Sequence, residues 1–157
     1  MEPLIALVVV TLGLYAAGAA GVRQLRPWPV PLRGGLAVMF TMTGLAHFVG
    51  MRDELIAMVP PALPAPEFLV TITGIFELAG AAGLLIGWAA PWAAAGLTAL
   101  LLGVFPANVY AAVEGIATDG HQALLPRTLM QVVFLAATIA VFLGTRPRSL
   151  VRQPARP

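Results

Sequence analysis

The chain has 157 residues, of which 59% are hydrophobic and 10% are charged. An average soluble domain is roughly 45–50% apolar and about 25% charged. A soluble globule of this size could not cover such a core with so few charges, which excludes a soluble enzyme, a disordered chain and a collagen-like fibre. Together with a mean hydropathy of +0.89, the composition predicts an integral membrane protein.

Two missing residue types narrow the chemistry further. The sequence contains no cysteine, which excludes disulfides, thiolate nucleophiles, Cys-ligated zinc and iron–sulfur clusters. It contains no lysine either, so a Schiff base has no side-chain amine. His47 and His121 are the only histidines, and we expect no metal site and no intrinsic cofactor. The arginines lie beside apolar segments, which favours membrane topology over a nucleic-acid partner.

Five apolar segments follow one another and are predicted to be transmembrane helices, at residues 4–22, 34–50, 68–88, 92–113 and 124–144. Each has close to the ~20 residues that cross a bilayer, and helices are expected because lipid leaves no partner for backbone polar groups. Pro91 and Pro126 suit the first turns of the last two helices. The first segment is interpreted as a retained helix rather than a signal peptide, because no positive charge precedes it.

The charges divide the chain into three parts and give it an orientation. Residues 1–33 form an N-terminal helix and a basic loop, 34–144 a four-helix core, and 145–157 an Arg- and Pro-rich tail. Positive loops stay in the cytoplasm. We therefore expect a multi-pass protein of the cell membrane with the N-terminus outside and the C-terminus cytoplasmic.

Glu77 is the most informative residue within the apolar segments. It lies ten residues after Glu67, which is about 15 Å along a helix and near the bilayer centre. A charged side chain there costs about 2.5–3.5 kcal/mol on insertion scales. Glu77 is therefore either part of a functional site or a neutral group that joins two helices by a hydrogen bond.

Other polar residues are predicted in the same, outer half of the membrane, on four different helices. They are His47, Asn108, Arg127 and Gln131, with Thr73 in support. We predict one site, in which Glu77 and His47 exchange protons and the other residues bind a ligand. Simpler interpretations stay open for individual members: a backbone carbonyl can satisfy His47, and Arg127 can extend to lipid headgroups. Pro106 is expected to bend its helix and free the carbonyl of Leu102.

Two further features concern packing. Residues 51–67 contain a short amphipathic stretch and four prolines, which fits either an interfacial connector or a lid over the predicted site. Gly80, Gly83 and Gly87 share one helix face, where small residues allow a close approach of neighbouring helices. This face suits packing inside the bundle or, alternatively, a homo-oligomer.

Four sequence stretches together resemble the DoxX-like family of small membrane proteins. They read GLAHF at 44–48, MVPPALP at 58–64, TGIFELAG at 73–80 and VFPAN at 104–108. Arg127 and Gln131 at the head of the last segment fit the same pattern. The resemblance spans about residues 36–142 and implies a four-helix core, to which this chain adds an N-terminal helix.

The family takes its name from a membrane subunit of a thiosulfate:quinone oxidoreductase, so the resemblance implies a quinone-linked role. The first hypothesis is thus a redox accessory that binds a quinone near Glu77 and receives electrons from a partner redox protein. The second is a non-catalytic membrane scaffold in which Glu77 joins two helices. The third is a small transporter or proton pathway, which the absence of visible inverted repeats makes the weakest of the three.

Overall fold

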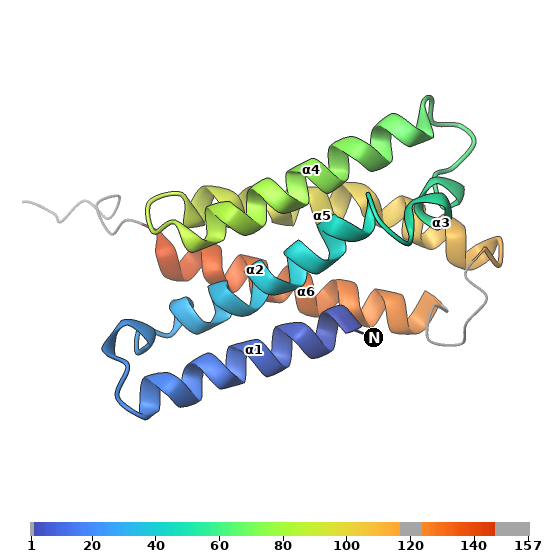
Figure 1. The fold of residues 1–157 in the computed structure, drawn as a ribbon. Helices are drawn as coiled ribbons and strands as arrows, with labels where there is room; N and C mark the ends of the chain where they lie inside the picture. Colours follow the sequence, from blue (N-terminus) through green and yellow to red (C-terminus); the bar gives the residue numbers. More distant parts are fainter. Residues whose placement is uncertain (1, 117–123, 147–157) are drawn as a thin grey trace, which may run out of the picture.

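The computed structural model describes residues 2–116 and 124–146, and these ranges are helical throughout apart from their turns (Figure 1). The helices are α1 (Glu2–Ala19), the 3-10 turn η1 (Arg23–Leu25), α2 (Pro29–Ala46), α3 (Arg52–Ala57), α4 (Pro66–Leu85), α5 (Ala90–Val113) and α6 (Leu124–Thr145). The expectations for His121 and for the tail beyond Arg146 fall outside the described ranges.

The long helices run antiparallel to their neighbours in sequence (Figure 1). Helices α2, α4, α5 and α6 form a ring in which each packs on the next, and α1 lies outside this ring against α2. One end of the bundle carries η1, the α4–α5 turn and the C-terminal end of α6 (Figure 1). We call this the η1 end, and the opposite end, which carries α3, the α3 end.

All five predicted segments are helical, and the largest difference in their bounds concerns α2. This helix begins at Pro29, five residues before the predicted start. Proline is tolerated in the first turn of a helix, where the amide hydrogens have no intrahelical partner. Arg33 therefore lies within α2 instead of the basic loop, and its Nε donates to the carbonyl of Leu84 at 2.6 Å, near the end of α4. Such carbonyls need a partner from outside the helix.

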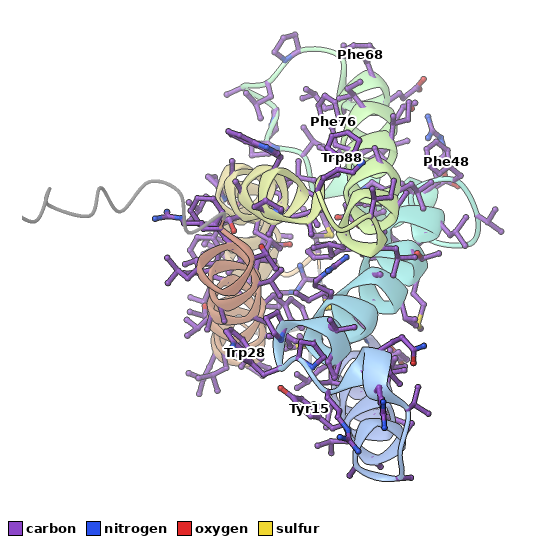
Figure 2. The ribbon with its side chains drawn as sticks, turned by 90° about the vertical axis from the view of Figure 1, so that its left-hand side faces the viewer. Tyr15, Trp28, Phe48, Phe68, Phe76 and Trp88 are labelled. Carbon is purple, nitrogen blue, oxygen red and sulfur yellow. The ribbon has the colours of Figure 1, made fainter. Side chains whose placement is uncertain are left out.

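Four helices are long and apolar enough to cross a membrane, namely α1, α4, α5 and α6. Helix α2 is not among them, because Pro29, Pro31 and Arg33 lower the hydropathy of its first half. The outer surface of the bundle is apolar: Phe68 and Phe76 project from α4, and Trp88 follows this helix (Figure 2). Large exposed apolar side chains over most helices are typical of a surface that contacts lipid. The chain is thus an all-helical membrane protein in the part described.

Glycines set the distances between helices at several crossings. A Cβ added at Gly80 would lie 2.5 Å from Leu97, and one at Gly83 would lie 2.8 Å from Ala93. Both glycines thus pack α4 against α5 inside the bundle. Gly87 lies beyond the end of α4 and has no atom within 4 Å of such a Cβ. At the α1–α2 crossing, a Cβ at Gly35 would overlap the hydroxyl of Thr11.

Replacing Gly35 by alanine is therefore expected to force α1 away from α2. The added methyl group would also lie 2.8 Å from the backbone carbonyl of Leu7, which cannot rotate away. We expect the free energy of unfolding in detergent to fall by about 1–3 kcal/mol, as for other overpacked sites. The matched control is Gly96→Ala in α5, where a Cβ meets nothing within 4 Å. Equal thermal unfolding midpoints for the two variants would contradict the close packing of α1.

Candidate functional site

A cavity of about 690 Å³ lies between the helices in the half of the bundle nearer to the α3 end. Its walls come from α2, α3, α4, α5 and α6, and the first residues of α1 also reach it. All six residues singled out from the sequence line this cavity: His47, Thr73, Glu77, Asn108, Arg127 and Gln131. The structure thus brings together groups that are up to 84 positions apart in the chain, from His47 to Gln131.

Glu77 lies inside the bundle on α4, with 8% of its surface exposed. Its Oε2 accepts a hydrogen bond from the Thr43 hydroxyl of α2 at 2.5 Å. This contact depends on Gly44, because a Cβ there would lie 3.2 Å from the Cβ of Glu77 and 2.9 Å from the Leu78 side chain. The other carboxyl oxygen, Oε1, has no hydrogen-bond partner among the residues described and remains available to a ligand.

His47 lies at the end of α2 rather than four residues inside it, because the helix ends at Ala46. Its Nδ1 lies 2.9 Å from the carbonyl oxygen of Thr43. A carbonyl only accepts, so Nδ1 carries the hydrogen and Nε2 of a neutral ring is left as an acceptor. The ring packs against Gly74 of α4, where a Cβ would lie 2.6 Å from that of His47. Thr43 thus contacts both acid–base candidates, one through its carbonyl and the other through its hydroxyl.

Arg127 and Asn108 form the second polar group of the cavity, on α6 and α5. The Nη1 of Arg127 donates to Oδ1 of Asn108 at 3.2 Å and lies 3.8 Å from the sulfur of Met58. Asn108 uses its oxygen in this contact, so its amide nitrogen can donate elsewhere. The sequence left two roles open for Arg127, and in the structure its guanidinium connects α5, α6 and the segment after α3.

Gln131 joins α6 to α5 near the bend expected at Pro106. Its Nε2 donates to the carbonyl of Leu101 at 2.6 Å, and its side chain is buried. Helix α5 continues through Pro106, which removes one backbone donor from the helix. The sequence predicts a freed carbonyl at Leu102, and the glutamine binds the carbonyl directly before it. Gln131 therefore has a structural contact as well as a place in the cavity wall.

Thr73, expected to support the site, bonds to its own helix, and Thr43 is the threonine that contacts Glu77. The hydroxyl of Thr73 donates back to its own helix, to the carbonyls of Leu69 and Val70 at 2.8 and 3.0 Å. The Thr43 hydroxyl of α2 instead donates to Glu77, across the contact between α2 and α4. The spacing of Thr43 and His47, four residues apart on one helix, is the sequence signal that places both on the same face.

Methionines are the main feature of the cavity that the sequence reading missed. Five of the six in the chain line it: Met39, Met42, Met51, Met58 and Met130. They are scattered over four segments of the sequence, so only the fold shows that they share one space. Methionine is unbranched and polarizable, and it adapts to varied ligands and contacts aromatic rings favourably.

The segment predicted to be either an interfacial connector or a lid contributes to the wall of this cavity. Leu55, Met58 and Val59, from α3 and the residues that follow it, contribute to the lining. Arg52 fastens α3 to its neighbours: its guanidinium donates to the His47 carbonyl at 3.1 Å and to the Thr71 hydroxyl at 3.0 Å. Within the ranges that the structure describes, no group of three or more metal-ligating side chains is present.

The Thr43–Glu77 contact predicts a difference between two threonines of the same helix. Thr43→Val keeps the side-chain shape but removes the donor to a buried carboxyl, so we expect a loss of stability of about 0.6–1.7 kcal/mol, the range for hydrogen bonds in membrane proteins. Thr41→Val is the matched control, because Thr41 is exposed and bonds only to Ala37 of its own helix. Thermal unfolding in detergent measures both, and equal losses would contradict a special role of Thr43.

Comparison with known proteins gives one match. Residues 36–143, from Leu36 within α2 to Leu143 near the end of α6, match a family described as Domain of unknown function (DUF8561). The matched range covers the ring of four helices and the cavity residues from Met39 to Phe134, and it leaves α1 outside. No curated protein and no solved structure gives a significant match. The chain belongs to the family of the domain of unknown function DUF8561.

Proposed function

We propose that the chain binds a lipophilic small molecule of the quinone class in the cavity at the α3 end. One observation carries the proposal: a largely apolar space within apolar helices contains the Glu77–His47 pair and the Arg127–Asn108 pair. A ligand site is expected to have mainly hydrophobic walls and a few converging polar groups. A cavity of about 690 Å³ has room for a ring with a short tail.

The polar groups suit a head group that carries oxygen atoms. Asn108 has a free amide donor, and Arg127 brings a positive charge, so this pair can bind a carbonyl oxygen. Glu77 and His47 offer Oε1 and Nε2 and can exchange a proton with a hydroxyl or carbonyl oxygen. The methionine walls suit a planar ring between the two pairs. The resemblance to the DoxX-like family supports the same ligand class.

A redox role also needs an electron donor or acceptor. The sequence has no cysteine to hold an iron–sulfur cluster, so we assign the electron source to a partner redox protein. In this proposal the chain itself binds and orients the head group, and Glu77 and His47 supply or take up protons. The chain then acts as an accessory subunit of a membrane oxidoreductase.

The same proposal includes five membrane crossings, with α2 as the fifth. Helix α2 lies between α1 and α4 in an antiparallel arrangement, so its direction fits a crossing (Figure 1). Arg23, Arg26 and Arg146 lie at the η1 end, and Trp28, Trp88 and Trp92 surround it. Arginine-rich loops favour the cytoplasm, and tryptophans gather at membrane interfaces. We therefore place the η1 end in the cytoplasm and the N-terminus outside.

Extraction of bound small molecules tests the ligand. The protein is purified in mild detergent, and its lipophilic ligands are identified by mass spectrometry. We expect a stoichiometric quinone in the wild type and at least about tenfold less in Glu77→Gln, which corresponds to about 1.4 kcal/mol for one hydrogen bond to a charged or acidic group. Glu67→Gln is the matched control on the same helix, because Glu67 is exposed outside the cavity.

A second function is favoured by the hydrogen bond between Thr43 and Glu77, which joins α2 to α4. In a scaffold protein this contact would serve the bundle alone. The two functions differ in the same experiment. If no ligand is recovered from any folded variant while Glu77→Gln lowers the unfolding temperature, the quinone proposal fails and the scaffold is supported.

A further inference from the structure

A second cavity, of about 310 Å³, lies at the η1 end and is separate from the proposed quinone site. It is lined by Tyr15, Gly18, Ala19, Leu25 and Arg26. The chain reverses after α1 at Gly21, whose φ of +123° is a conformation that favours glycine. Turn η1 then returns onto the last turn of α1. This return needs Gly18, since a Cβ there would lie 3.0 Å from the carbonyl oxygen of Leu25.

The wall of this cavity is fixed by a hydrogen bond. The hydroxyl of Tyr15 donates to the carbonyl of Trp28 at 2.9 Å, and Figure 2 shows Tyr15 and Trp28 near each other, with the Trp28 ring beside α6. Defined contacts within the α1–α2 connection thus form this cavity, and Arg26 lies on its rim.

Charge is strongly segregated toward this end of the molecule. The sequence has no Asp or Glu at 3–52 or at 78–113, the stretches that build the α1–α2 connection and the α4–α5 turn. Among the residues that the structure describes, four arginines lie at this end: Arg23, Arg26, Arg33 and Arg146. An end without carboxylates attracts anions.

The four arginines differ in their contacts. Arg33 donates to the carbonyl of Leu84, and the guanidinium of Arg146 lies 4.0 Å from the centre of the Phe142 ring. The side chains of Arg23 and Arg26 are exposed and make no hydrogen bond or ion pair with the residues that the structure describes. Arg26 lines the cavity, and Arg23 lies one turn before it, where its carbonyl accepts a hydrogen bond from the Arg26 amide at 3.3 Å.

An apolar surface runs from the cavity along the outside of α1. Ile5, Val9 and Leu12 are each more than half exposed on this helix, which packs within the bundle mainly on α2. Trp28, half exposed at the same end of the bundle, suits a position at the membrane interface. A ligand that matches both the arginines and the apolar surface of α1 has an anionic headgroup and hydrocarbon chains. A soluble anion or an acidic peptide would use the arginines without the apolar surface.

We propose that this cavity binds the headgroup phosphate of an anionic phospholipid, with Arg23 and Arg26 as its ligands and an acyl chain along α1. Guanidinium groups bind phosphate oxygens in pairs of hydrogen bonds. The site would hold one lipid of the leaflet at the η1 end in a fixed position, and it would attach α1 to that lipid as well as to α2.

Native mass spectrometry tests the proposal on the full chain in mixed micelles of phosphatidylglycerol and phosphatidylcholine with identical acyl chains. We expect the wild type to retain phosphatidylglycerol preferentially. The double variant Arg23→Gln/Arg26→Gln should lose this preference by about tenfold to thirtyfold, given the contribution of each basic residue near an anionic surface. Arg146→Gln is the matched control at the same end, and it should keep the preference.

A further variant separates the cavity from the general charge of this end. Ala19→Phe leaves all arginines in place but fills the cavity, and it should also reduce retention of phosphatidylglycerol. Circular dichroism checks that each variant keeps its helices. Unchanged retention in the double variant or in Ala19→Phe would overturn the proposal, and so would displacement of the lipid by excess inorganic phosphate or by an acidic peptide. The quinone cavity is intact in all these variants, so its own test stays independent.

Discussion

The close approach of α2 and α4 is the constraint on which the site depends. Glycines at positions 44 and 74 remove the side chains that would otherwise hold the two helices apart. Only at this separation can the Thr43 hydroxyl reach Glu77 at 2.5 Å and the His47 ring pack against α4. A carboxyl inside a membrane bundle needs such a partner, because a lipid environment offers none. The position of the Glu77 carboxyl and the packing of the His47 ring therefore depend on the same close contact between α2 and α4.

The two ends of the bundle differ in chemistry, and the difference fits a protein with a ligand site in one half and a lipid contact in the other. The α3 end has the large cavity, the polar pairs and the methionines. The η1 end has arginines, tryptophans and a small cavity at its rim. Helix α1 extends between them, outside the range that the family match covers. The matched range contains all residues that line the large cavity except Glu2 and Pro3 of α1.

Much of this arrangement follows from the sequence, since apolar length predicts each long helix and the positions of the polar residues along these helices predict which of them share one half of the bundle. Helix rotation is not readable from one sequence, and it decides the contacts: it turns Thr43 toward Glu77 and leaves Thr73 bonded to its own backbone. The early start of α2 was missed because Pro29 and Pro31 look like loop residues although a first turn accepts them. The methionine lining could not be predicted because these residues come from separate segments of the sequence and meet only in the folded chain.

Arg52 links α3, which contributes to the wall of the large cavity, to the residues around Glu77 and His47. Its guanidinium bonds to the carbonyl of His47 and to α4, and it belongs to the helix whose neighbouring residues close the cavity. A displacement of α3 away from α2 would break the bond between Arg52 and the carbonyl of His47, the residue directly after α2. Arg52 thus links the position of α3 to the backbone that carries His47, whereas the contacts of the ring itself, to the Thr43 carbonyl and to Gly74, lie within α2 and α4.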